Sequence, residues 1–259
     1  MPELSNRIAV VTGGASGIGR ATAILLAEHG ADVFIGDYSH IDKNAAIFDP
    51  LGIIALPCDV RSESDLRQLI DSAAEANGTI DILVNNAGSG MAKQISEVTE
   101  QDWADCIDTN LKGAFFACKH AIGYMAVSQG GSIINMSSNA GLLSHSQAPV
   151  YSISKSALIA LTRSLALCHA RDKIRVNAVC PGPVEDTRMM NAALDNAPDR
   201  EATIRTCINA SPLARAYDRM TSPKEIAQAV FYLASDASCM VTGTALAIDG
   251  GKSLGITPM

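Results

Sequence analysis

The chain has 259 residues, of which 47% are hydrophobic and 18% charged, and its formal net charge is -7. A chain of this length can bury a substantial core as one domain. The acidic balance, with no block of Lys or Arg, argues against a nucleic-acid or anionic-membrane surface and favours small-molecule partners.

Location and redox state also leave signals in the sequence. No apolar run approaches the ~18 residues of a membrane span, and residues 1–6 lack the charged and apolar regions of a signal peptide, so we expect a cytoplasmic protein without membrane contact. The 7 cysteines form no CxxC pair and the 5 histidines show no metal spacing. We therefore expect reduced, mostly buried thiols and no metal site. His145 is interpreted as a solvated loop residue.

The first chemical signal is a glycine-rich turn. Residues 7–11 are apolar and β-branched, and they lead into TGGASGIG at 12–19, after which a helical pattern follows. Glycines at 13, 17 and 19 let the backbone turn tightly and approach a ligand, while the helix N-terminus presents N–H groups to a pyrophosphate. Strand, glycine turn and helix together predict a dinucleotide-binding unit.

An acidic residue follows at the position that such a unit requires. Residues 31–35 are expected to form the second strand, and Asp37 lies 18 residues beyond Gly19, the last glycine of the turn, about where a βαβ unit places its ribose-binding acid. A carboxylate accepts from the adenosine 2′- and 3′-hydroxyls and repels a 2′-phosphate, and Tyr38 and Ser39 supply no cation. NAD(H) is therefore favoured over NADP(H). The alternative is a turn-forming acid at a strand end.

The rest of the chain alternates strands with helices. Strands are expected at 53–57, 80–84, 131–136, 174–179 and 244–248, and helices at 62–76, at 99–124, from 151 onward and at 223–234. This alternation predicts an α/β fold, a doubly wound, Rossmann-like parallel sheet with helices on both faces, in one domain over 1–259. Its strand ends face the crevice where ligands bind. Residues 187–221 are expected to form a mobile lid; the alternative is two surface helices without a gating role.

A tyrosine and a lysine stand one helical turn apart. Tyr151 and Lys155 fall on the same face of a helix. An ammonium at that distance favours the phenolate, so the pKa of Tyr151 is expected below its ordinary value of about 10, which makes it a candidate general base. Such a pair also arises by chance, so the context decides.

Taken together, the motifs resemble the short-chain dehydrogenase/reductase family over nearly the whole chain. They are TGxxxGIG at 12–19, NNAG at 85–88, the Asn of TNLKG at 109–113, Ser138, YxxxK at 151–155 and PG at 181–182. Ser138 precedes Tyr151 by the family's usual interval, which selects it over the neighbouring Ser137.

The resemblance implies hydride transfer between nicotinamide and a carbonyl or alcohol carbon. Tyr151 would exchange the hydroxyl proton, and Ser138 would hydrogen-bond the substrate oxygen. Lys155 would lower the Tyr151 pKa and bind the nicotinamide ribose, and Asn110 would hold a water that links Lys155 to solvent. Cofactor contacts are expected at Gly13, Ser16, Gly17, Ile18, Gly19, Asp37, Asp59, Val60, Asn86, Ala87, Gly88, Tyr151, Lys155, Pro181, Gly182 and Val184.

One position departs from the family pattern. Asp186 stands where the family usually has a Thr that touches the nicotinamide, and Thr187 comes next. We leave both out of the predicted site. The prediction is an NAD-dependent oxidoreductase acting on a small-molecule secondary alcohol or ketone, assembled as a homotetramer. The alternatives are a 3-oxoacyl-thioester (acyl carrier protein) reductase, which would normally prefer NADPH, and a non-catalytic dinucleotide-sensing protein.

Overall fold

The computed structural model describes residues 3–39, 41, 44–75, 77–128 and 130–255. Its centre is a seven-stranded sheet in the order β3-β2-β1-β4-β5-β6-β7, and every neighbouring pair is parallel. The strands are β1 (Ile8–Thr12), β2 (Asp32–Asp37), β3 (Ile54–Pro57), β4 (Ile82–Asn85), β5 (Gly131–Met136), β6 (Ile174–Pro181) and β7 (Ala245–Ile248).

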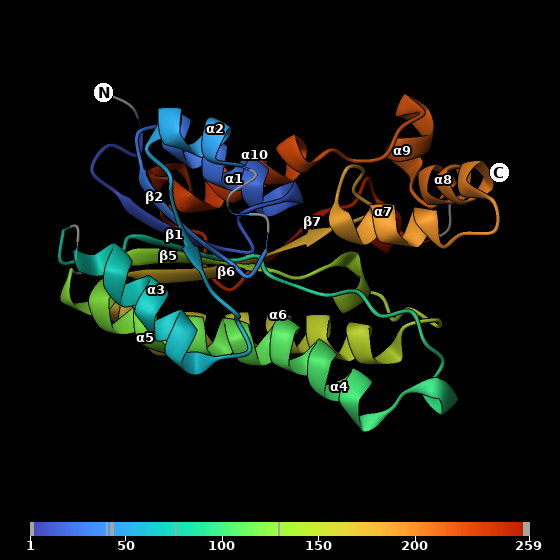
Figure 1. The fold of residues 1–259 in the computed structure, drawn as a ribbon, viewed down its shortest axis with the longest axis horizontal. Coiled ribbons are helices and arrows are strands. Elements are labelled where there is room, and N and C mark those ends of the chain that lie inside the picture. The colour runs from blue at the N-terminus through green and yellow to red at the C-terminus, as the bar shows by residue number, and fades with distance from the viewer. Residues whose placement is uncertain (1–2, 40, 42–43, 76, 129, 256–259) are drawn as a thin grey trace.

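Helices cover both faces of this sheet (Figure 1). The α-helices are α1 (Gly17–Glu28), α2 (Ala45–Phe48), α3 (Glu63–Glu75), α4 (Glu100–Ile107), α5 (Gly113–Val127), α6 (Pro149–His169), α7 (Arg188–Asp195), α8 (Arg200–Asn209), α9 (Pro212–Tyr217) and α10 (Pro223–Ala234). Short 3-10 turns lie at Asp49–Leu51, Ile95–Glu97, Asn139–Gly141, Ala170–Asp172, Asp236–Ser238 and Lys252–Leu254. Helices α1, α2 and α10 lie on one face, and α3 to α6 lie on the other.

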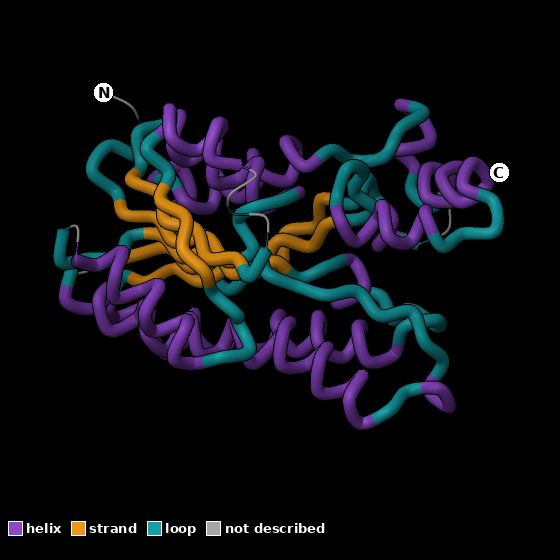
Figure 2. The backbone as a smooth tube through the Cα atoms, viewed as in Figure 1, coloured by secondary structure: helices purple, strands orange, loops and turns teal. Residues whose placement is uncertain are grey.

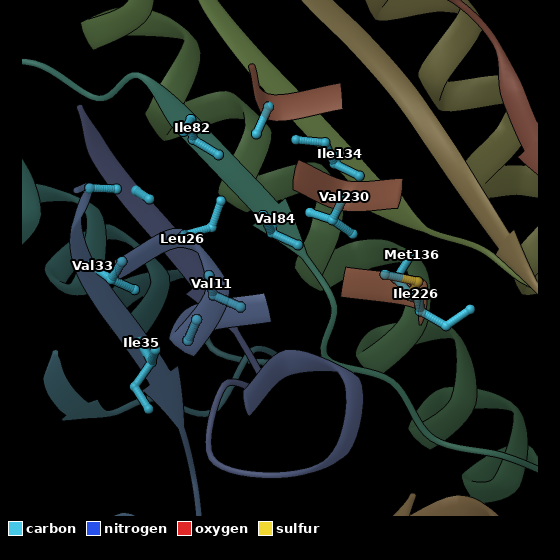
Figure 3. Packing of buried hydrophobic residues seen from close by; sticks show 14 of the residues in the cluster. Val11, Leu26, Val33, Ile35, Ile82, Val84, Ile134, Met136, Ile226 and Val230 are labelled. Atoms are coloured by element: carbon cyan, nitrogen blue, oxygen red, sulfur yellow. The ribbon is translucent and has the colours of Figure 1, made fainter. Parts of the chain in front are cut away.

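Alternating side chains on the central strands build a core on each face. Ala9 and Val11 of β1 point to the side of α1 and α10, while Ile8 and Val10 point to the side of α3 and α5, and all four are fully buried. Figure 3 shows the first of these cores. A Val or Ile side chain buried this way stabilises the fold by about 1.5–3 kcal/mol, so a doubly covered strand is mostly apolar.

The strand order reverses between β1 and β4. The chain runs outward from β1 to β3, returns to the centre, and then runs the other way from β4 to β7. Doubly wound sheets bind their ligands at the carboxyl ends of the strands at this reversal. The register pairs Thr12 with Asn85, which places the glycine turn beside the Asn-Asn-Ala-Gly segment.

The predicted α/β fold is confirmed, with two differences in its elements. Strand and helix ends differ from prediction by one or two residues at most positions, and residue 76, the expected end of α3, lies outside the described residues. The helix expected at 99–124 is α4 and α5 joined by a π-helical turn, Asp108–Lys112. Extra-wide turns of this kind occur frequently at functional sites.

The segment between β6 and α10 lies outside the sheet. It contains α7, α8 and α9, and Figure 2 shows these helices beyond the carboxyl ends of the strands. A single parallel bridge between Val184 and Thr221 joins the two ends of the segment. Residues 187–221 are called the lid below; its mobility stays a prediction.

Cysteine burial follows the expectation. Cys58, Cys106, Cys118 and Cys180 are buried, whereas Cys168 and Cys239 are exposed. Burial raises the pKa of the Cys118 thiol to about 12, so this group stays protonated at neutral pH. Within the described residues, no helix is long and apolar enough to cross a membrane.

Candidate active site

The glycine turn is held by the end of the neighbouring strand. Gly13 has a φ of +64° and donates its N–H to the carbonyl oxygen of Gly36 at 2.7 Å. The side-chain amide of Asn86 donates to the carbonyl oxygens of Thr12 at 3.1 Å and of Gly13 at 2.9 Å. A Cβ on Gly19 would overlap the Gly13 carbonyl oxygen. Asn86, predicted to bind cofactor, thus uses its side chain to shape the turn.

The first turn of α1 offers its N-terminus to a ligand. Ser16 is the N-cap residue in extended conformation, and its side chain does not cap the helix in the structure as described. Gly17 follows with a φ of +52°, then Ile18, and both are partly accessible. Backbone N–H groups at such a terminus attract phosphate. The tight glycine cradle and the uncapped terminus fit a dinucleotide pyrophosphate.

Asp37 ends β2 next to this turn. Its carboxylate accepts from the backbone N–H of Ala15 at 3.1 Å and of Ser39 at 3.1 Å, and the residue is only 8% exposed. The carboxylate is therefore fixed at the rim of the glycine turn, where the prediction placed the adenosine ribose. Its free lone pairs can still accept from sugar hydroxyls.

Asp59 and Val60 follow β3 at the same edge of the sheet. Asp59 is ion-paired to Arg61, with 2.7 Å between Arg61 Nη2 and Asp59 Oδ2, and this hydrogen bond lowers the Asp59 pKa. Val60 is buried, and its carbonyl oxygen would lie 2.8 Å from a Cβ on Gly113. The absence of that Cβ lets α5 begin against the end of β3.

Asn110 lies in the π-helical turn and is almost completely buried. Its Oδ1 accepts from the N–H of Ser89 at 2.7 Å, and its Nδ2 donates to the carbonyl oxygen of Ser89 at 3.0 Å and to Ser154 Oγ at 3.1 Å. Ser154 Oγ in turn donates to the carbonyl oxygen of Tyr151 at 2.8 Å. The Asn110 side chain thus ties the loop after β4 to α6.

Gly88 lies between Asn110 and Lys155 of α6. A Cβ here would lie 3.2 Å from Asn110 Oδ1 and 3.3 Å from Lys155 Nζ. The neighbouring Ala87 donates its N–H to Thr12 Oγ1 at 3.2 Å. The Asn-Asn-Ala-Gly segment therefore contacts both the glycine turn and the lysine, as its expected place between the two halves of a cofactor requires.

Ser138, Tyr151 and Lys155 meet at the carboxyl end of β5. Ser138 Oγ donates to Asn139 Oδ1 at 3.2 Å, and Ser138 lies near enough to the Tyr151 hydroxyl to lower the Tyr151 pKa in opposition to burial. Lys155 Nζ lies 5.7 Å from the centroid of the Tyr151 ring. Ser137, the rival of Ser138, donates its hydroxyl to the carbonyl oxygen of Lys155 at 2.8 Å and is used in packing.

The pKa of Tyr151 runs opposite to the expectation from the sequence. Removal from water raises it above its ordinary value, and the Ser138 side chain opposes this only in part. Lys155 is itself 3% exposed, and burial lowers its pKa to about 8. The prediction counted the charge of Lys155 and omitted the burial of both groups, which disfavours the charged form of each.

Pro181, Gly182 and Val184 continue from β6 toward the lid. Gly182 donates its N–H to the carbonyl oxygen of Ile248 at 3.1 Å, and a Cβ on it would lie 3.0 Å from Asp249 Cα. Val184 is buried and forms the bridge at the base of the lid. These residues therefore fix the point from which the lid departs.

The backbone turns at Asp186, the residue that stands where the family pattern has a Thr. It has a φ of +53°, a left-handed conformation that is rare for residues other than glycine. The turn at Asp186 places Thr187 as the N-cap of α7, where its hydroxyl accepts from the Met190 N–H at 3.2 Å. The Thr187 methyl group also lies 3.4 Å from where a Cβ on Gly17 would be. Thr187, omitted from the predicted site, thus faces the glycine turn.

A match to a protein family accompanies this geometry. The family model described as enoyl-(acyl carrier protein) reductase matches residues 13–253. The chain belongs to the short-chain dehydrogenase/reductase family. It is accordingly an oxidoreductase, and dehydrogenases of this family use nicotinamide cofactors.

Three relatives of this short-chain dehydrogenase/reductase cover almost its whole length. It is 38% identical over 252 residues to cis-4-hydroxycyclohexanecarboxylate dehydrogenase of Sinomonas cyclohexanicum, covering 95% of this chain and 96% of that one. It is 35% identical over 253 residues to the 3-oxoacyl-acyl-carrier-protein reductase FabG of Thermotoga maritima, covering 96% and 98%. The ligand-free Thermoplasma acidophilum aldohexose dehydrogenase superposes with a TM-score of 0.89 at 34% identity, covering 100% and 99%.

The site predicted from the sequence did not include four residues that the structure places there. Ser89 and Ser154 bind the Asn110 side chain, Thr187 lies beside the glycine turn, and Arg188 contacts the loop after Asp37. Ser154 stands immediately before Lys155 in the YxxxK motif, so its position was a usable signal. Arg188 carries no such signal, because its partners are 150 residues away in the chain.

Proposed function

We propose that this short-chain dehydrogenase/reductase is an NAD-dependent enzyme that interconverts a small secondary alcohol and its ketone, with Tyr151 as the general acid and base. The observation that carries the proposal is the convergence of Ser138, Tyr151 and Lys155 in one site on the sheet edge that Asp37 also occupies. Bound at the glycine turn, the nicotinamide dinucleotide would supply or accept the hydride.

Each of the chain's own residues has a role in the proton movement. Ser138 donates a hydrogen bond to the substrate oxygen and stabilises the charge that develops on it. Tyr151 accepts the hydroxyl proton in oxidation and returns it in reduction. Lys155, close to the Tyr151 ring, favours the phenolate while it is charged. Asn110 and Ser154 are positioning residues, since they act by fixing the backbone at Tyr151.

Asp37 supports NAD over NADP. A carboxylate that is held by two backbone N–H groups cannot turn away from a 2′-phosphate without leaving those donors unpaired. The resulting repulsion lowers the affinity for NADP.

The lid residues Met189 and Met190 support closure of the hydride-transfer site against water, because Met189 packs against Gly90 in the loop after β4.

The alternative of a 3-oxoacyl-thioester reductase has one supporting observation, the similarity to the Thermotoga maritima enzyme. Asp37 weighs against it because such an enzyme normally prefers NADPH. A non-catalytic dinucleotide sensor is disfavoured by the assembled Ser138, Tyr151 and Lys155.

A spectrophotometric panel tests the proposal. Secondary alcohols, cyclic alcohols, hydroxy acids and aldoses are offered with NAD+, and a 3-oxoacyl thioester is offered with NADPH, in each case to wild type and to Tyr151→Phe. We expect Tyr151-dependent turnover with NAD+. Turnover of the thioester with NADPH alone would favour the reductase, and turnover of nothing while dinucleotide binds would favour the sensor. We also propose a homotetrameric, cytoplasmic protein.

A further inference from the structure

The first residue of α7 reaches back to the loop that follows Asp37. Arg188 donates from Nη2 to the hydroxyl of Tyr38 at 2.9 Å and from Nη1 to the hydroxyl of Ser39 at 3.4 Å. Its guanidinium also lies over the Tyr38 ring, 5.6 Å from the centroid. These contacts join segments that are 150 residues apart in the chain.

The connection passes over the glycine turn. Thr187, which directly precedes Arg188, lies against Gly17 at the N-terminus of α1. After β6 the chain therefore passes the N-terminus of α1, and its Arg188 side chain contacts the loop that follows Asp37. Under the proposed function, the pyrophosphate binds at that N-terminus and the adenosine ribose at Asp37. Thr187 and Arg188, called the strap below, thus span the strip between these two cofactor groups.

Packing does not account for this arrangement. Tyr38 is 67% exposed, so little surface is buried by holding its ring under the guanidinium. Among the residues that the structure describes, Arg188 forms no ion pair with a carboxylate. Tyr38 and Ser39 themselves supply no cation, but in the structure Arg188 of the lid places one beside them.

We propose that Arg188 is a cofactor-retaining residue. By binding Tyr38 and Ser39 it closes the strap over the dinucleotide groove, so the strap must open for the cofactor to enter or leave. This inference rests on the proposed function for the identity of the ligand. The retained group is a nicotinamide dinucleotide, and its release rate is set in part by the opening of the strap.

The size of the effect follows from exposure. Arg188 and Tyr38 are both exposed, and an exposed cation–π contact together with an exposed hydrogen bond should change the opening rate by about threefold to tenfold. Because the strap opens for entry as well as for exit, Arg188→Ala should accelerate both steps. The dissociation constant should then change less than the release rate.

Stopped-flow release of NADH tests the strap. The variants are Arg188→Ala, Tyr38→Phe, which keeps the ring and loses the hydroxyl, and the double variant. Arg200→Ala is the matched control, because Arg200 is an exposed lid arginine that pairs with Asp195 at 2.9 Å. We expect NADH release to be faster in Arg188→Ala than in wild type, and intermediate in Tyr38→Phe. The double variant should release NADH at the rate of Arg188→Ala, and the Arg200→Ala control at the wild-type rate.

Three outcomes overturn the proposal. They are equal release rates in Arg188→Ala and Arg200→Ala, fully additive effects of the two strap substitutions, and an Arg188→Ala effect confined to NADP(H), which would make Arg188 a 2′-phosphate ligand instead. If wild type binds no dinucleotide, the proposed function fails, and the retaining role of Arg188 fails with it. Hydrogen exchange of residues 188–195 in the free protein tests the strap contacts separately: we expect faster exchange in Arg188→Ala, and unchanged exchange overturns the strap even if dinucleotide binds.

Discussion

Lys155 donates a hydrogen bond of 2.9 Å from Nζ to the carbonyl oxygen of Met136, the last residue of β5. The ammonium of α6 is thereby anchored to the sheet beside Ser138 and Tyr151, with 3% of the residue exposed. A lysine in such a place is costly for the fold, because burial removes its charge from water and lowers its pKa from 10.5 to about 8.

The first prediction concerns this cost. The folded state binds the Lys155 proton more weakly than the unfolded state, so the penalty is fully present below about pH 8 and is relieved as the pH rises toward 10.5. Lys155→Met should therefore be more stable than wild type near neutral pH, and its advantage should shrink across that window. Chemical denaturation at several pH values measures both quantities. Lys119→Met, on the exposed side of α5, is the control, and the same pH-dependent gap there would contradict the argument.

Tyr151→Phe should remove proton exchange and spare binding. The ring stays in place and the adenosine site is far away, so kcat/KM should fall by about 10²- to 10⁴-fold while NADH affinity stays close to wild type. Initial rates and fluorescence titration give the two values. Tyr232→Phe on α10 is the matched control and should behave as wild type. Full activity in Tyr151→Phe would refute the assigned role.

Asp37→Ser should narrow the preference for NAD+ over NADP+. The substitution removes the repelling carboxylate, and Arg188, beside Ser39, is then positioned to favour a 2′-phosphate. It also leaves the Ala15 N–H without its partner, which should cost about 1 kcal/mol of stability. The ratio of the two kcat/KM values is the measurement, and Asp32→Ser at the exposed start of the same strand is the control. An unchanged ratio would remove Asp37 from cofactor selection.

The sequence predicted the fold well because strands covered on both faces are mostly apolar. Residues 8–11 and 82–84 therefore stood out, and the alternation with helices determined the sheet. The π-helical turn at Asn110 left no such pattern, since a turn wider by one residue barely shifts a helical periodicity.

In the site, the structure brings the motif residues together, but the sequence did not predict their hydrogen-bond partners. Ser138 and Ser137 differ by one position, and only the structure shows that Ser137 bonds to the Lys155 carbonyl. The raised Tyr151 pKa and the nearness of Arg188 to Tyr38 depend on burial and on contacts between distant segments. Neither burial nor such contacts can be inferred from the spacing of residues along one helix or strand.

Thr187→Ala should lower activity beyond the effect of a lost helix cap. Thr187 caps α7 and faces Gly17, whereas Asp199 caps α8 of the same lid through a 2.9 Å bond from the Ala202 N–H. Both alanine variants should lose about 0.5–2 kcal/mol of helix stability. Only Thr187→Ala should also raise the KM for the dinucleotide, because only Thr187 faces the groove. Equal KM values for the dinucleotide in the two variants would show that Thr187 acts only as a helix cap.

The last prediction is assembly into a homotetramer through two different two-fold interfaces, one at the outer face of α5 and α6 and the other at α10 and β7. Phe115 is 50% exposed and Leu167 is 84% exposed, which is unusual for large apolar side chains. Phe115 lines a groove together with Cys118, Lys119, Ile122, Leu165 and His169. Leu167 stands on α6 between Leu165 and His169 in the sequence. A self-complementary pairing of this face about a two-fold axis would bury it.

Light scattering tests the assembly. It should give four times the monomer mass for wild type, and Phe115→Glu with Leu167→Glu should lower that mass. Ile95→Glu, at an apolar residue 80% exposed in another part of the molecule, is the control and should keep the wild-type mass. A monomer mass for wild type at working concentration would contradict the prediction.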